Sequence, residues 1–309
     1  MKKILVIGSL NMDMRIGLHK IPVVGETVLG NSLVYTPGGK GANQACAAGK
    51  LGRETVMLGS IGDDNAGRQL KESLEKSSVD TRFLRISKRN GTGTAVIYVD
   101  TEGNNSIVVY TGANNDCDVE YLKENDKLFR ECEYIILQME IPRDAVAYAV
   151  RRGRELSKVV ILNPAPAPER MPEGIYPNVD YLTPNETELI KLAGFEEVTE
   201  ENIRTGAHIL TERGVRNVLV TLGDKGCCWF HDGKEEVVDA VKVRAIDTTA
   251  AGDCFNGAFA VALSEGMDVM QAIRFANIAS SITVTREGAQ EAIPDRKSVD
   301  QRTMDVAGG

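Results

Sequence analysis

One stretch near the C-terminal end has the residue types needed to bind and transfer an anion. It reads Asp-Thr-Thr-Ala-Ala-Gly-Asp-Cys-Phe (247–255) and leads directly into an apolar helix pattern that continues to about Ser264. The N–H groups of residues 250–253 would then lie at a helix N-terminus, which is an anion-binding place. Asp253 is negatively charged and would compete with a bound anion, so its presence there needs a reason. It could take the proton from a hydroxyl that attacks a bound phosphate, or it could simply cap the helix.

A glycine-rich turn precedes another helix pattern early in the chain. It reads Pro-Gly-Gly-Lys-Gly-Ala-Asn-Gln (37–44), and the alanine-rich helix pattern runs to about Leu51. Glycines before a helix allow the backbone to approach a small ligand closely, and Lys40 and Asn43 would supply donors. The spacing is not that of a nucleotide-binding P-loop, and an ordinary glycine-rich turn stays an alternative.

Polar side chains follow two buried strand patterns. Asn11 and Asp13 come after the apolar run 3–8, and Glu140 ends the run 134–140. Open α/β sheets bind ligands at the carboxyl ends of their strands, so these side chains could hold hydroxyl groups of a ligand. An Asx turn is the alternative for Asn11 and Asp13. A dinucleotide enzyme is disfavoured because no G-x-G-x-x-G turn follows the first strand.

Short apolar strands and amphipathic helices alternate along most of the chain. This pattern predicts an α/β fold with a doubly wound, mostly parallel sheet and helices on both faces. Asn185 and Glu188 have the spacing of a helix capping box. We expect one strand over 55–62, a hairpin over 218–230 at the sheet edge, and the last two helices over about 253–264 and 269–283.

Two segments depart from this alternation. Residues 13–37 and 93–111 have the period of short strands and are broken by turns. We predict that they form a small inserted β-sheet lid, while residues 1–12, 38–92 and 112–309 form the α/β core. Apolar residues on both faces of the lid need to be covered. A substrate beneath the lid and a second subunit above it, in a homodimer, would cover them.

Charge and composition exclude several classes of partner. The chain has 36 Lys and Arg against 44 Asp and Glu, a net charge of −8, which disfavours nucleic acid and anionic membranes. No apolar run reaches the about 18 residues of a membrane span. The six cysteines have no metal-binding spacing. We therefore expect a cytoplasmic protein, with a frayed end at Gly308-Gly309.

The motifs 39–45, 185–188 and 247–253, in this order, closely resemble those of the ribokinase-like carbohydrate kinase family, which includes adenosine kinase and fructokinases. The resemblance runs from Lys3 to about Pro294. It implies a phosphotransferase with an alcohol acceptor that uses ATP to phosphorylate D-ribose at O5, giving D-ribose 5-phosphate and ADP. Kinases of 2-deoxyribose, fructose, adenosine or cytidine stay open, as does a sugar-binding regulator without catalysis.

The resemblance also implies a role for each motif residue. Asp253 would be the catalytic base, and the N–H groups of Ala250, Ala251 and Gly252 would hold the γ-phosphate. The sugar would contact Asp253 and the residues Asn11, Met12, Asp13, Gly39, Lys40, Gly41, Asn43 and Glu140. ATP would lie along Gly252 and the residues Asn185, Thr221, Leu222, Gly223, Asp224, Lys225, Gly226 and Asn277.

Two cations complete the implied site. Glu188 would order Mg²⁺, through water, because Mg²⁺ keeps much of its hydration. K⁺ would be bound by Asp247 and Thr249 and by carbonyl groups of Thr283, Arg286 and Gly288. Three residues differ from common family members: Cys254 replaces a usual Thr, Asn277 replaces a His, and Ala292 replaces a Ser that would complete the K⁺ shell.

Overall fold

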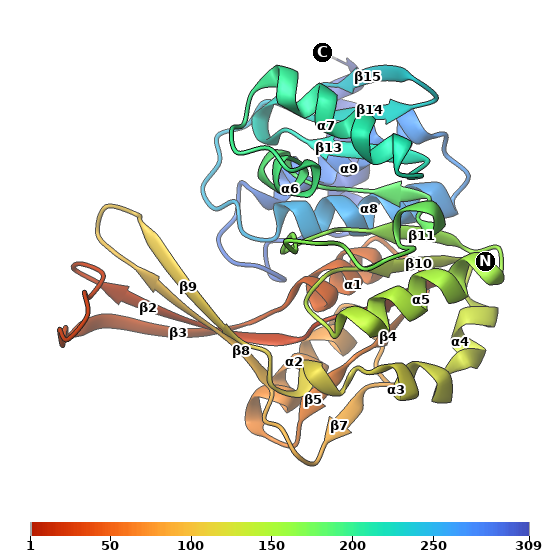
Figure 1. The fold of residues 1–309 in the computed structure, drawn as a ribbon. Helices are drawn as coiled ribbons and strands as arrows, with labels where there is room; N and C mark the ends of the chain where they lie inside the picture. The colour runs from red at the N-terminus through yellow and green to blue at the C-terminus, as the bar shows by residue number, and fades with distance from the viewer. Residues whose placement is uncertain (1, 309) are drawn as a thin grey trace.

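The computed structural model describes residues 2–308, and the frayed end expected at Gly308-Gly309 reaches outside them. A nine-stranded sheet forms the centre of the main body (Figure 1). Its strands pair in parallel from the β6 edge to β13, whereas the pairings of β13 with β14 and of β14 with β15 are antiparallel. In spatial order they are β15 (Lys234–Val238), β14 (Cys227–His231), β13 (Asn217–Thr221), β12 (Tyr181–Leu182), β11 (Val159–Leu162), β10 (Tyr134–Leu137), β1 (Ile4–Ile7), β4 (Thr55–Leu58) and β6 (Val79–Asp80).

Helices cover both faces of this sheet. Successive side chains of a strand point to opposite faces, so Ile4 and Val6 pack in one core and Leu5 and Ile7 in the other. The first core includes α1 (Lys40–Lys50), α2 (Asn65–Lys76), α8 (Ala251–Ser264), α9 (Val269–Thr283) and α10 (Arg296–Gly308). The second includes α3 (Val119–Glu124), α4 (Asp126–Glu131), α5 (Arg143–Glu155), α6 (Glu186–Ala193) and α7 (Glu200–Glu212). The predicted α/β fold is confirmed.

A separate four-stranded sheet projects from the main body (Figure 1). Its order is β3 (Gly30–Gly38), β2 (Asn11–Leu18), β8 (Gly93–Val99) and β9 (Asn105–Tyr110). The two hairpins are joined by a parallel pairing of β2 with β8, whereas the sequence suggested only antiparallel strands. Because β2 continues from the end of β1, this small sheet starts beside the carboxyl edge of the large one.

Three local expectations need correction. Residues 55–62 form two strands in different sheets, because the strand is interrupted at Gly59. A Cβ at this position would lie 2.7 Å from the Gly8 carbonyl oxygen. The second of them, β5 (Ser60–Gly62), pairs with β7 (Arg85–Ser87). The 218–230 hairpin is followed by β15, which takes the edge position. A further helix, α10, follows α9. Within residues 2–308 no helix has the length and apolarity to cross a membrane.

Candidate active site

The first turn of α8 carries the predicted anion site. Ala250 precedes the helix with φ of 59°, a left-handed conformation that is uncommon for a residue with a side chain. Gly252 is exposed, and a Cβ there would meet no atom within 4 Å. The N–H groups of a helix's first turn have no partner within the helix, so this turn can present donors to the open space at Gly252. The Ala251 N–H also donates to the Thr248 carbonyl, at 3.3 Å. It can hold an anion the size of a phosphate.

Two amides from α1 hold the carboxylate of Asp253. Asn43 Nδ2 donates to Asp253 Oδ2 at 2.9 Å, and Gln44 Nε2 donates to Oδ1 at 3.0 Å. The helices α1 and α8 approach closely, since a Cβ at Gly257 would lie 2.6 Å from the Ala47 methyl group. Asp253 is only 8% exposed, so its orientation is set by these contacts. Gln44 was not among the predicted site residues.

Glu140 joins the glycine-rich turn to the end of β1. Its Oε2 accepts from Ser9 Oγ at 2.5 Å and from the Lys40 backbone N–H at 3.3 Å. Gly41 N–H donates to Ser9 Oγ at 3.3 Å, and a Cβ at position 41 would lie 2.6 Å from Ser9 N. Only glycine permits this approach. Ser9 is a further residue that the motifs did not reveal.

Four carboxylates act on the Lys40 ammonium. Burial lowers the pKa of Lys40, but the charges of Asp253, Glu140, Glu188 and Asp13 together outweigh it, so the pKa is raised. The pKa of Asp13 is raised from 3.8 to about 7, mainly by burial and then by Glu140 and Asp253, with Lys40 opposing. The predicted sugar-binding residues, base and magnesium-ordering residue thus share one electrostatic environment.

The remaining sugar-side residues line the junction of the two sheets. Asn11 is buried at the start of β2, and its Oδ1 accepts from Asn114 Nδ2 at 2.7 Å. Asn114 Oδ1 accepts in turn from the Leu10 N–H at 2.9 Å, so Asn114 is another residue missed in the sequence. Met12 is buried in the first core. Gly39 has φ of 90°, which glycine adopts readily.

Asn185 and the 221–226 turn lie side by side, as predicted for one nucleotide-binding surface. Asn185 caps α6 in a complete capping box with Glu188, and it bridges to Thr221. The turn contains a 3₁₀ segment over Gly223–Lys225 and is closed by the Leu222 N–H donating to the Gly226 carbonyl at 2.8 Å. Burial raises the pKa of Glu188, although the Asn185 N–H and Lys40 oppose this.

The side chain of Asn277 is hydrogen-bonded to the backbone at the end of β15. Its Nδ2 donates to the carbonyl oxygens of Val238 at 3.1 Å and Asp239 at 3.2 Å, and the residue is 8% exposed. The amide therefore fixes the end of β15, against which Gly226 packs. Asn277 thus contacts the end of β15, and the end of β15 contacts Gly226 of the predicted nucleotide-binding surface.

The residues predicted to bind K⁺ form two linked groups beside the anion site. Asp247 Oδ1 accepts from the N–H and Oγ1 of Thr249, at 2.9 and 2.6 Å, and Oδ2 accepts from the Gly288 N–H at 3.1 Å. The Thr283 carbonyl accepts from the Arg286 N–H at 3.1 Å. Burial raises the pKa of Asp247, but its hydrogen bonds to Thr249 and Gly288 outweigh this and lower it.

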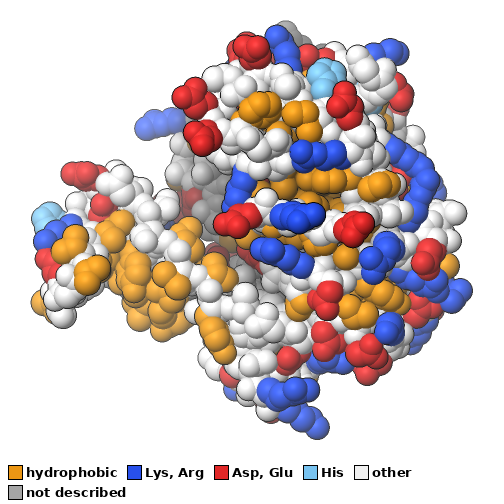
Figure 2. Space-filling model, in the orientation of Figure 1, with side chains coloured by type: hydrophobic (Ala, Val, Ile, Leu, Met, Phe, Trp, Pro, Cys, Tyr) orange, Lys and Arg blue, Asp and Glu red, His pale blue; other side chains and the backbone are white. Residues whose placement is uncertain are grey.

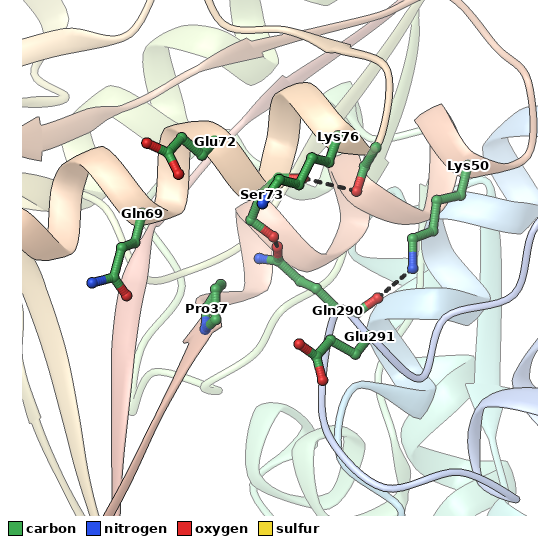
Figure 3. Close-up of a pocket in the computed structure, with 9 residues that line it drawn as sticks. Pro37, Lys50, Gln69, Glu72, Ser73, Lys76, Gln290 and Glu291 are labelled. Atoms are coloured by element: carbon green, nitrogen blue, oxygen red, sulfur yellow. Dashed lines mark hydrogen bonds between the residues drawn. The ribbon is translucent and has the colours of Figure 1, made fainter.

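A cavity of about 320 Å³ lies behind this loop, between α1, α2 and residues 290–291 (Figure 3). Lys50 donates there to the carbonyls of Gln290 at 2.6 Å and Ile293 at 3.0 Å, which anchors the loop. None of the predicted site residues lines the cavity. Its lining consists of Pro37, Lys50, Gln69, Glu72, Ser73, Lys76, Ser77, Gln290 and Glu291. The cavity is therefore separate from the residues predicted to carry out the chemistry.

Fold and site together define a sugar-phosphorylating enzyme. The model of the pfkB family of carbohydrate kinases matches residues 1–296, and the chain belongs to that family. The chain is 39% identical to a ribokinase of Bacillus subtilis, covering 97% of this chain and 99% of that one. It is 35% identical to a deoxyribokinase of Salmonella typhi, covering 94% and 95%.

Among solved structures, the ribokinase of Arabidopsis thaliana complexed with ribose and ATP is similar, with a TM-score of 0.91 and 33% identity. The match covers 97% of this chain and 98% of that one. These findings confirm the resemblance seen in the motifs. The chain is a phosphotransferase with an alcohol group as acceptor.

Proposed function

We propose that this chain transfers the γ-phosphoryl group of ATP to O5 of D-ribose, giving D-ribose 5-phosphate and ADP. The observation that carries the proposal is the Asp253 carboxylate, held by two amides in the first turn of α8. The turn presents N–H donors for a phosphate, and the carboxylate lies within it. Relatives named as ribokinases, and a solved one with ribose and ATP, support the choice of substrates.

In this mechanism Asp253 accepts the proton of the sugar hydroxyl as its oxygen attacks the phosphorus of ATP. The N–H groups of Ala250, Ala251 and Gly252 stabilise the negative charge on the transferred group. Lys40, whose raised pKa keeps it charged, offsets the surrounding carboxylates. Asn11, Asp13 and Glu140 orient the sugar, with Met12, Gly39 and Gly41 shaping the backbone around it.

Two cations fit the residues that are present. Glu188 is a carboxylate whose charge interacts with Lys40 and Asp253, and it would order Mg²⁺ that is bound mostly by phosphate and water. K⁺ would take oxygen ligands from Asp247 and Thr249 in the loop before α8. Carbonyl groups of Thr283 at the end of α9 and of Arg286 and Gly288 in the loop that follows would supply the others, since Gly288 contacts Asp247. Magnesium would neutralise phosphate charge, and potassium would stabilise the loops.

ATP would lie along Asn185, the 221–226 turn and Gly252. The open space at Gly252, where even a Cβ has no neighbour, leaves room for phosphate. Asn277 would contribute by holding the end of β15 beside this surface.

A second candidate is phosphorylation of 2-deoxyribose, because one relative is named a deoxyribokinase. A site built to hydrogen-bond a hydroxyl discriminates against the analogue that lacks it, and Asp13 is a partly buried acceptor on the sugar side. We therefore expect ribose to exceed 2-deoxyribose in kcat/KM by about tenfold or more. Fructose, adenosine and cytidine rank lower, and a regulator without catalysis lower still.

The small sheet would act as a lid over the sugar and as a dimer contact. We place the lid at residues 13–37 and 93–111 and the core at 1–12, 38–92 and 112–309. Hydrophobic side chains gather on the projecting arm (Figure 2). Consecutive residues of β3 and β9 are exposed, including Tyr35 at 56% and Val108 at 59%, so both faces need cover. A homodimer through the lid would provide it.

A cytoplasmic location suits this function, since ATP is the phosphoryl donor. All six cysteines are free and buried, as in proteins of reducing compartments.

An assay of ADP release tests the proposed function. Ribose, 2-deoxyribose, fructose, adenosine and cytidine would be compared in kcat/KM, each with Asp253→Asn as the matched inactive control. Ribose should rank first. A hexose or nucleoside in first place would overturn the choice of ribose, and no ADP release with any of them would favour the regulator.

A further inference from the structure

Gln44 is completely buried in α1 and uses both N–H bonds of its side-chain amide. Its Nε2 donates to Asp253 Oδ1 at 3.0 Å and to Asn163 Oδ1 at 3.2 Å. Its Oε1 accepts from Gln138 Nε2 at 2.7 Å. Asn43 donates to Oδ2 of Asp253, so Gln44 provides the hydrogen bond that fixes the other carboxylate oxygen, Oδ1.

The Asp253 carboxylate, which only accepts hydrogen bonds, determines which way the Gln44 amide points, and Gln138 donates to the oxygen of that amide. If the Gln44 amide were turned around, its nitrogen would face the nitrogen of Gln138, and its carbonyl oxygen would face the Asp253 carboxylate. Both contacts are repulsive, so the orientation seen in the structure is the favoured one for Gln44, while the buried Oε1 of Gln138 has no hydrogen-bond partner among the described residues. Gly8 at the end of β1 leaves the space for Gln138, because a Cβ at position 8 would overlap Gln138 Oε1.

The same chain of hydrogen bonds continues to the anion site. Asn163 Nδ2 donates to the Thr183 carbonyl at 3.0 Å, Thr183 Oγ1 donates to Asn256 Oδ1 at 2.6 Å, and Asn256 Nδ2 donates to the Gly252 carbonyl at 2.8 Å. The Gly252 carbonyl and the Asp253 N–H belong to one planar peptide. Fixing that carbonyl therefore also fixes the direction of the Asp253 N–H in the first turn of α8, next to the N–H groups assigned to the phosphate.

We propose that Gln44 is the positioning residue for phosphoryl transfer in this protein. It aligns the Asp253 carboxylate for proton transfer and, through Asn163, Thr183 and Asn256, keeps that carboxylate in register with the phosphate-binding peptide. The inference rests on the proposed function, in which Asp253 takes the proton. It assigns a role to a completely buried residue that is outside the residues predicted to bind sugar and ATP.

The test compares Gln44→Met and Gln44→Glu with wild type in kcat, KM and pH profile. A donor to a carboxylate favours its ionised form, so Gln44→Met should lower kcat by about 10-fold to 100-fold and move the acidic limb up by about one pH unit. KM for ribose and ATP should change by less than about threefold. Gln44→Glu should be most active at lower pH than wild type, because only a protonated Glu can donate to Asp253.

Tyr134→Phe is the matched control. It removes a buried hydrogen bond of similar length, 2.9 Å from Tyr134 Oη to the Leu263 carbonyl, at the far end of α8. It should lower Tm without moving the pH profile. Opposite pH shifts in the two Gln44 variants cannot come from lost stability alone.

Wild-type kcat and pH profile in Gln44→Met would overturn the inference. If both Gln44 variants fail to fold, Gln138→Met is the deciding variant, because Gln138 acts on Asp253 only through Gln44. This variant should lower kcat and shift the acidic limb of the pH profile. An unchanged profile would overturn the proposal. Absent ribose kinase activity in wild type, or normal turnover in Asp253→Asn, would instead overturn the proposed function.

Discussion

Replacing Asp13 with asparagine should stabilise the free protein at alkaline pH while weakening its hold on the sugar. The pKa of Asp13 is raised from 3.8 to about 7, mainly by burial and then by Glu140 and Asp253. A raised pKa means that the folded protein holds the proton more tightly than the unfolded chain does. Wild-type stability must therefore fall as the pH rises from about 4 to about 7, and it stays lower above that range.

The magnitude follows from the size of the shift. A change of roughly three pKa units corresponds to about 4 kcal/mol if the site is fully shielded. Asp13 is only partly buried, so solvent reduces this, and we expect about 1–2 kcal/mol. The asparagine side chain carries no charge, so Asp13→Asn should raise Tm by about 2–6 °C at pH 8. At pH 5 the rise should be about a third of that, because folded Asp13 is protonated there while the unfolded side chain is already ionised.

Sugar binding should change in the opposite direction. Ionised Asp13 is the stronger acceptor for a hydroxyl, so KM for ribose in wild type should fall by about tenfold between pH 6 and pH 8. Asp13→Asn should have a higher KM that no longer depends on pH in this range. The measurements are Tm by calorimetry and KM by ADP release, both at pH 5 to 8.

Asp100→Asn in the exposed turn between β8 and β9 serves as the control of opposite sign. Hydrogen bonds, the strongest from the Asn104 side chain, lower the pKa of Asp100, so its loss should destabilise the protein at pH 8. A Tm difference between wild type and Asp13→Asn that is equal at pH 5 and pH 8 would refute the reasoning, as would a lower Tm for the variant at pH 8.

Three further outcomes are expected. Asp253→Asn should bind ATP and ribose with near wild-type Kd in calorimetry but lose kcat by about 100-fold or more, and near-normal turnover would reject its role as the base. Activity should require Mg²⁺ and be higher in K⁺ than in Na⁺, and Asp247→Ala should remove the effect of K⁺. Equal wild-type rates in potassium and tetramethylammonium salts would argue against a K⁺ site. Light scattering at micromolar concentration should give a dimer that Val108→Glu dissociates, and a wild-type monomer would contradict the lid contact.

Local patterns were sufficient for much of the fold. The alternation of apolar strands and helices predicted the large sheet, and the capping box at Asn185 and Glu188 was predicted and confirmed. The break at Gly59 was not predictable, because residues 55–62 have continuous strand character. The strand ends there since Gly59 packs against Leu10 and the Gly8 carbonyl, which are distant in sequence.

The sequence by itself determined the chemistry that this protein can perform. Small residues with one glycine, a helix start and an acid at 247–253 predict an anion site with a base, because helix N-termini and tight turns depend on neighbouring residues. Only the tertiary structure decided how that base is held. Asn43 and Gln44 lie 210 and 209 residues from Asp253, and Ser9 lies 131 residues from Glu140. Such pairings, and the raised pKa of Asp13, arise from burial and charge that exist only after the two sheets and α8 have packed together.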